Sequence, residues 1–200
     1  MQIRHKNREI YFREQTECTQ KYVIPYIEQV LCIKSNLRVL EIGCGEGGNL
    51  KPFLDVGCHC VGIDIDVAQL EKAKAFFANH SLNKNLRLIA NDIYKVSPNE
   101  IGNFDLIILR DVIEHLPNQE LFMHQLKCFM HSESVVFFGF PVWCNPFGGH
   151  QQICRNKWLS HTPWLHLLPN RLYKKALQLG GESASTIKAL LDIKATGISL

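Results

Sequence analysis

Four acidic residues occupy equivalent places along the sequence, each at the end of a short apolar run. Glu41 follows "RVL", Asp64 follows "VGI", Asp92 follows "LIAN" and Asp111 follows "LIILR". Carboxylates accept hydrogen bonds from hydroxyl and amino groups, and they attract positive charge. Their repeated placement predicts a binding site for a small polar ligand.

A glycine-rich segment, "GCGEGG", follows the first of these acids and contains four glycines among six residues. Glycine permits tight turns and lets the backbone approach a ligand, so this segment is typical of a nucleotide-binding loop. Two spacings fit: Gly43, Gly45 and Gly48 match the dinucleotide fingerprint, whereas Gly43, Gly45 and Gly47 match a tighter pattern. Glu41 argues against a dinucleotide, because its negative charge would lie beside the pyrophosphate.

Two histidines have the chemistry for proton transfer at neutral pH. His115 lies in "DVIEHL", where it could equally pack a loop, and His150 follows two glycines in "NPFGGHQQ". Irregular segments of this kind often carry functional side chains. We therefore prefer His150 as the candidate general base and keep His115 as a second candidate.

The eight cysteines do not indicate a metal site. Cys58, His59 and Cys60 are adjacent in an expected strand, where neighbouring side chains point to opposite faces, and no second ligand pair follows at zinc-site spacing. Without an export signal, the cysteines are expected to be reduced thiols.

Strands and helices that would position these residues alternate along the chain. Apolar, β-branched strands alternating with helices indicate an α/β fold with a doubly wound, mostly parallel sheet and helices on both faces. The carboxyl ends of such strands face the ligand crevice. The expected strands are 37–43, 59–65, 86–92, 104–111 and 134–141, and the expected helices are 16–31, with a kink or boundary at Pro25, then 48–56, 67–80 and 118–130.

Four segments in this order, "VLEIGCGEGG", "VGIDID", "IANDI" and "FDLIILRDVIEHLPN", resemble the class I S-adenosylmethionine-dependent methyltransferases. The resemblance covers Leu37 to about Pro141 and implies a Rossmann-like fold with S-adenosylmethionine as the cofactor. This cofactor has no phosphate, and its sulfonium and ammonium groups are compatible with Glu41. The family pattern ends with two further strands, for which the sequence after Leu190 gives no signal.

The resemblance also implies roles for individual residues. The loop from Gly43 to Gly47 would pass under the methionine part of the cofactor, and Asp64 would hold both ribose hydroxyls. Asp92 would accept from the adenine amine, and the backbone of Arg110 would meet the methionine amino group. The predicted cofactor-binding residues are Glu41, Gly43, Cys44, Gly45, Gly47, Asp64, Ile65, Asp92, Ile93 and Arg110.

The function implied is transfer of a methyl group to oxygen, nitrogen or carbon of a small molecule by in-line displacement. "LRDVIEHL" stands where methyltransferases of base amines carry an Asn/Asp-Pro-Pro-Tyr/Phe motif, which argues against a DNA base as the acceptor. Two alternatives stay open, namely an NAD-dependent oxidoreductase and a non-catalytic S-adenosylmethionine-binding protein.

The composition is that of one soluble globular domain of 200 residues. We expect a helical region at 1–35, a cofactor-binding core at 36–141 and an acceptor-side or lid region at 142–200. A net charge of +3 does not indicate nucleic acid as a partner, and no apolar run is long enough for stable membrane insertion. A cytoplasmic location is expected, and the oligomeric state is not indicated.

Overall fold

The computed structural model describes residues 7–197, which form two compact units. The first contains the described residues up to Arg110 together with Asn118–Gly139, and the second contains Asp111–Pro117 and the described residues from Phe140 onward. The outermost parts of the expected N-terminal and C-terminal regions, 1–6 and 198–200, lie outside the described residues.

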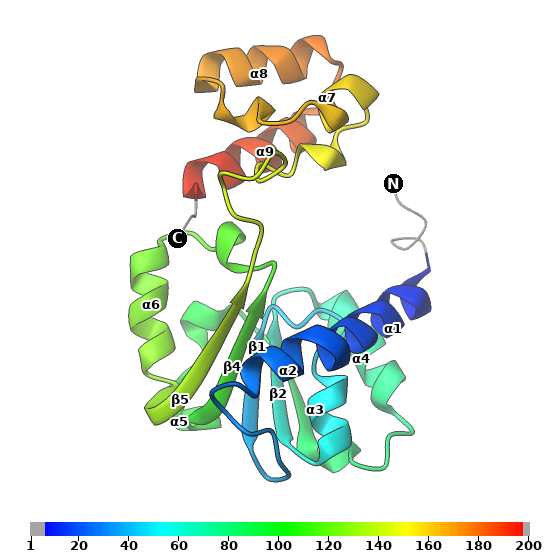
Figure 1. Cartoon of the computed structure of the whole chain (residues 1–200), viewed down its shortest axis with the longest axis vertical. Helices are drawn as coiled ribbons and strands as arrows, with labels where there is room; N and C mark the ends of the chain where they lie inside the picture. The colour runs from blue at the N-terminus through cyan, green and yellow to red at the C-terminus, as the bar shows by residue number, and fades with distance from the viewer. Residues whose placement is uncertain (1–6, 198–200) are drawn as a thin grey trace. The chain divides into compact units, whose positions relative to one another are not determined.

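Five parallel strands form the sheet of the first unit, in the order β3-β2-β1-β4-β5 (Figure 1). The strands are β1 (Arg38–Ile42), β2 (His59–Asp64), β3 (Leu86–Ala90), β4 (Phe104–Arg110) and β5 (Met130–Gly139). This confirms the predicted α/β fold class. Only β5 differs notably from expectation, because it begins at Met130 and its pairing with β4 shifts register between Phe104 and Leu106. No strand follows β5 within residues 7–197.

Helices cover both faces of this sheet. On one face, Val39 and Leu106 belong to a core cluster with Phe53. Leu40 and Ile107, the next residues along these two strands, point to the other face and are also fully buried. The helix α6 packs against β5 (Figure 1). The helices of this unit are α1 (Arg8–Cys18), α2 (Ile24–Ile27), α3 (Lys51–Val56), α4 (Val67–Phe77), α5 (Pro98–Ile101) and α6 (Gln119–Lys127).

The N-terminal helical region begins earlier than the sequence pattern indicates and has three parts. A π-helical turn, Thr19–Val23, separates α1 from α2. Pro25 lies in the first turn of α2, where its missing N–H costs no hydrogen bond, which agrees with the predicted boundary.

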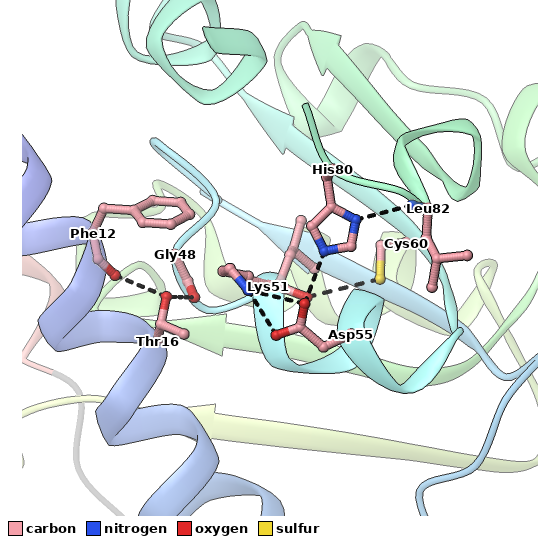
Figure 2. Close-up of polar contacts among 9 residues, drawn as sticks. Phe12, Thr16, Gly48, Lys51, Asp55, Cys60, His80 and Leu82 are labelled. Atoms are coloured by element: carbon pink, nitrogen blue, oxygen red, sulfur yellow. Dashed lines mark hydrogen bonds and ion pairs between the residues drawn. The ribbon is translucent and has the colours of Figure 1, made fainter. Parts of the chain in front are cut away.

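Two polar clusters hold the helices that flank the glycine-rich loop (Figure 2). The Thr16 hydroxyl contacts both the Phe12 carbonyl of its own helix at 2.9 Å and the Gly48 carbonyl at 3.0 Å. Asp55 of α3 accepts from Lys51 at 2.8 Å and lies 2.8 Å from Nε2 of His80, which follows α4. These contacts attach α1 to the loop and join α3 to the segment after α4.

The second unit consists of helices and short turns, with no strand among its described residues. Its core is an apolar cluster that includes Tyr173, Leu177 and Leu190. Its helices are α7 (Lys157–His161), α8 (Asn170–Leu179) and α9 (Ala184–Thr196). Across residues 7–197, no helix combines the length and apolar character needed to cross a membrane. The cytoplasmic location stays a prediction.

Candidate functional site

The backbone of the glycine-rich loop decides between its two possible spacings. Gly43, Gly45 and Gly47 have φ angles of 71°, 52° and 79°, in the left-handed region that favours glycine. Gly48 is outside that region, but a Cβ atom there would lie 2.8 Å from the Phe12 carbonyl oxygen of α1. The loop conformation therefore requires the tighter pattern, and the fourth glycine is needed for the close approach of a helix.

Asp64, at the end of β2, holds the loop with its carboxylate. Its Oδ2 accepts from the backbone N–H of Gly45 at 2.7 Å, and its Oδ1 accepts from that of Asp66 at 2.8 Å. The side chain is only partly buried. Each carboxylate oxygen has two lone pairs, so both oxygens retain the capacity to accept from a ligand hydroxyl.

Glu41, the last residue but one of β1, is a buried acid. Its Oε1 accepts from the amide of Asn49 at 2.8 Å, whereas its Oε2 has no hydrogen-bond partner among the described residues. Burial raises the pKa of this carboxyl to about 8, against the lowering effects of the Asn49 hydrogen bond and the Arg110 charge. A buried carboxyl with an unpartnered oxygen suits a ligand that brings positive charge.

Asn49 and Thr19 complete this site and were missed by the sequence analysis. Asn49 Oδ1 accepts from the Thr19 hydroxyl at 2.9 Å and from Arg110 at 3.0 Å. The Arg110 side chain also donates to Cys18 Sγ at 3.0 Å. The only signal in the sequence is that a polar residue follows the glycines, and nothing marks Thr19, which is thirty residues away along the chain.

Glu46, an acid inside the glycine-rich loop, was also missed by the sequence analysis. Its side chain is fully buried, with Arg8 Nε of α1 at 2.7 Å and Lys72 Nζ of α4 at 3.6 Å. An ion pair of this kind fixes the loop between two helices, because a buried carboxylate is costly without its partners.

The remaining predicted cofactor residues lie in or beside this region. Asp92 Oδ1 accepts from the N–H of Tyr94 at 3.1 Å and so caps a short 3₁₀ turn, and Ile93 is buried. The register of β2 and β3 places Asp64 opposite Ala90, two residues before Asp92. Cys44 is buried, which raises the pKa of its thiol, whereas Ile65 is exposed.

Both predicted catalytic histidines lie in the second unit, where the structure brings them together. The His115 and His150 rings meet edge to face at 5.5 Å between centroids. Their Nε2 atoms lie 3.9 and 3.7 Å from Oε1 of Glu114, a third member that the sequence analysis did not select. These distances exceed a hydrogen bond, and an ion pair with Glu114 forms only when an imidazole is protonated.

The protonation states of this cluster suit proton transfer at neutral pH. Burial lowers the pKa of His115, and burial together with the neighbouring His115 lowers that of His150. Burial raises the pKa of Glu114 to about 7, with Asp111 adding to the effect. Both carboxyl oxygens of Glu114 and Nε2 of His150 are buried without a hydrogen-bond partner among the described residues. Neutral imidazoles of this kind can accept a proton.

Residues 7–197 contain no candidate metal site. No group of three or more His, Cys, Asp or Glu side chains is placed to hold a metal ion there. All eight cysteines are free thiols.

Comparison with known proteins gives a consistent result. A family model described as a methyltransferase domain matches residues 12–179. The ubiquinone biosynthesis O-methyltransferase of Bartonella tribocorum is 26% identical over 192 residues, covering 84% of this chain and 76% of that protein. The protein of the same name from Brucella melitensis is 26% identical over 125 residues, covering 57% of this chain and 49% of that protein. The chain thus spans about half the length of the second relative.

Solved structures share the fold at low sequence identity. A putative S-adenosylmethionine-dependent methyltransferase from Methanococcus maripaludis has a TM-score of 0.57 at 14% identity, over 94% of this chain and 80% of that one. Coclaurine N-methyltransferase, solved with N-methylheliamine and S-adenosylhomocysteine, has a TM-score of 0.53 at 20% identity, over 61% of this chain and 35% of that one.

Proposed function

Because the chain belongs to the methyltransferase domain family and its cofactor is S-adenosylmethionine, we propose that it methylates a hydroxyl oxygen of a small molecule. The observation that carries the choice of oxygen is the cluster of His115, His150 and Glu114. A hydroxyl acceptor must lose a proton, and a neutral imidazole is suited to take it. The O-methyltransferase relatives support the same choice.

The residues around the glycine loop fit the cofactor proposed for them. Glu41 offers a buried, unpartnered oxygen, which favours an ammonium or sulfonium group nearby, whereas a pyrophosphate would gain no favourable charge interaction from it. Asp64 offers two acceptor oxygens for ribose hydroxyls. Asp92, Ile93 and the Arg110 backbone are proposed to border the adenine and the methionine amino group, and the loop from Gly43 to Gly47 to lie under the methionine part.

S-adenosylmethionine supplies an electrophilic methyl group on a sulfonium centre. The chain must then bind the acceptor and take its proton. We assign that proton to Nε2 of His150, because this nitrogen is buried and without a partner in the described chain, and because its pKa is lowered. Glu114, 3.7 Å away, then stabilises the imidazolium that forms.

The test is methyl transfer by the purified protein over a panel of catechols, simple phenols and amines, with S-adenosylhomocysteine measured as the product. His150→Gln should lower kcat for hydroxyl acceptors by about 10²- to 10⁴-fold and leave S-adenosylhomocysteine affinity unchanged. His161→Gln, at an exposed histidine of α7, is the matched control.

Three outcomes would contradict parts of this proposal. Full activity of His150→Gln would show that His150 is not the general base. Turnover of amines alone would replace oxygen by nitrogen as the acceptor atom. Cofactor binding without turnover of any acceptor would indicate a non-catalytic binding protein. That nucleic acid is not a partner stays a prediction, which the same panel can test with DNA and RNA oligonucleotides.

A further inference from the structure

The side-chain amide of Asn49 has only one orientation that satisfies its neighbours. Arg110 and the Thr19 hydroxyl both donate to it, at 3.0 and 2.9 Å, so its oxygen must face them. Its nitrogen must then face Glu41, to which it donates at 2.8 Å. The amide cannot turn round, because a donor would then face the guanidinium.

This arrangement links Glu41 to a positive charge through one intervening amide. Arg110 does not form an ion pair with the Glu41 carboxyl. The Asn49 amide lies between them, and the Arg110 charge lowers the pKa of Glu41 from that distance. The other ionisable groups that interact with Glu41 are Asp64 of β2 and the buried thiols Cys44 and Cys60. None of these three favours a charged carboxylate, so within the described part of the chain Arg110 and Asn49 alone oppose the cost of burial.

The two oxygens of Glu41 differ in their surroundings. Oε1 is occupied by Asn49, and Oε2 is buried with no partner in the described part of the chain. A buried carboxyl in that condition is held neutral by burial until a positive charge arrives. The methionine part of the proposed cofactor carries such charges on its ammonium and sulfonium groups.

We propose that Asn49 and Arg110 are positioning residues that hold Glu41 ready to ionise, so that the protein releases a proton when S-adenosylmethionine binds. The proton leaves the Glu41 carboxyl for the solvent, and the carboxylate that remains neutralises the positive charge of the ligand. This proposal rests on the proposed role of Glu41 at the cofactor site. It adds a linkage between cofactor affinity and pH, and it assigns a role to two residues outside the glycine pattern.

The direct test counts protons by titration calorimetry with S-adenosylhomocysteine, in buffers that differ in ionisation enthalpy. At pH 6.5 a carboxyl with a pKa of about 8 is still protonated, and the amino group of the ligand is already protonated. The wild-type protein should therefore release about 0.9 proton per ligand bound. Glu41→Gln should release almost none and bind about tenfold more weakly, because one charge-assisted interaction is lost.

Asn49→Asp tests the positioning role with nearly unchanged shape. The new carboxylate still accepts from Thr19 and Arg110, which should keep the fold, but it offers Glu41 no donor and adds a like charge beside it. We expect proton release to be lost and affinity at pH 6.5 to fall at least tenfold. Thr16→Val is the matched control, since it removes a hydrogen bond from the same helical region to Gly48 without touching Asn49. It should lower the melting temperature but leave the proton count unchanged.

The outcomes separate this inference from the function on which it rests. Tight ligand binding with fewer than about 0.2 proton released at pH 6.5 would overturn the inference and leave the cofactor assignment intact. An unchanged proton count in Asn49→Asp would overturn the positioning role. Failure of the wild-type protein to bind the ligand, by calorimetry or by thermal shift, would instead overturn the cofactor site itself.

Discussion

Asp64 has a structural role at the glycine-rich loop and a proposed ligand role, both through one carboxylate. Asp64→Ala removes the acceptor for Gly45 and also the proposed acceptor for the ribose hydroxyls. We expect S-adenosylhomocysteine to bind more weakly by about 1.5 to 3 kcal/mol, since charge-assisted hydrogen bonds are lost. Calorimetry measures this change directly.

The control for Asp64→Ala is Asp55→Asn, which removes an acid of α3 that contacts Lys51 and His80. It should lower the free energy of unfolding slightly and leave ligand affinity as it is. Equal affinity in Asp64→Ala and the wild-type protein would show that the ribose does not depend on this residue.

At the scale of single residues, the sequence indicated the acids at strand ends but not the residues that support them. Glu41 and Asp64 could be selected as candidate ligand-binding acids because a parallel sheet brings the carboxyl ends of its strands to one edge. Asn49 could not, because its role depends on Thr19 and Arg110, which are distant in the chain. Glu114 was missed because a short turn buries it beside His150, and no spacing rule describes that pairing.

At the scale of elements, two glycines of the loop should respond differently to alanine. Gly47→Ala places a side chain at a φ of 79° and within 2.9 Å of the Phe77 ring, so it should distort the loop and weaken ligand binding. Gly48→Ala meets the backbone of α1 instead and should lower the free energy of unfolding by about 1 to 3 kcal/mol. Urea denaturation and ligand titration together measure both effects.

The expected contrast between these variants concerns affinity. Once corrected for any unfolded fraction, affinity should fall more in Gly47→Ala than in Gly48→Ala. A larger loss of affinity in Gly48→Ala than in Gly47→Ala would instead favour the wider dinucleotide spacing.

The attachment of α1 to the loop provides a prediction with an internal control. Arg8 of α1 is 2.7 Å from the buried Glu46, whereas Arg13 of the same helix pairs at 3.7 Å with the exposed Glu17. Arg8→Gln leaves a buried carboxylate with a distant lysine as its only ion partner in the described chain, and should cost about 1 to 3 kcal/mol of unfolding free energy. Arg13→Gln should cost about 0 to 0.5 kcal/mol. Equal costs would mean that α1 does not hold the loop through this pair.

The element boundaries show where local patterns stop being informative. The apolar spacing predicted a helix near Thr16, but α1 begins at Arg8, where the residues are mostly polar and none is fully buried. Stacking of Phe12 on Phe76 at 4.4 Å stabilises this polar helix. Such a contact cannot be inferred from local periodicity, because it joins two helices across the fold.

At the scale of the whole molecule, the fold class was predictable because one repeated pattern specifies it. Alternating buried strands and helices leave few arrangements for a parallel sheet, and the first unit adopts one of them. The residues from Phe140 onward carry no such repeat, and their helices depend on a separate cluster around Tyr173. Their expected lid role stays a prediction.

The pH dependence of global stability follows from the buried acids and histidines. Glu41 holds its proton up to about pH 8 in the folded chain but loses it near pH 4.5 when unfolded. Between these values the folded state binds more protons, so this group makes stability fall as pH rises, by about 5 kcal/mol in total. His115 and His150 act oppositely, because their lowered pKa values make stability fall as pH drops below 6.5.

We therefore expect Glu41→Gln to gain stability relative to the wild-type protein as pH rises from 5 to 9, with unfolding free energies measured by urea denaturation. Glutamine keeps the acceptor for Asn49 and removes the proton equilibrium. The fall of the unfolding free energy with rising pH should therefore become less steep. Glu133→Gln, at an exposed acid of β5, should leave the slope as it is. Saturating S-adenosylhomocysteine should flatten the wild-type slope in the same way, because a ligand that ionises Glu41 removes the same proton difference. Identical slopes for Glu41→Gln and the wild-type protein would show that Glu41 is already ionised in the folded chain, and the coupling of its proton to the cofactor would then have no basis.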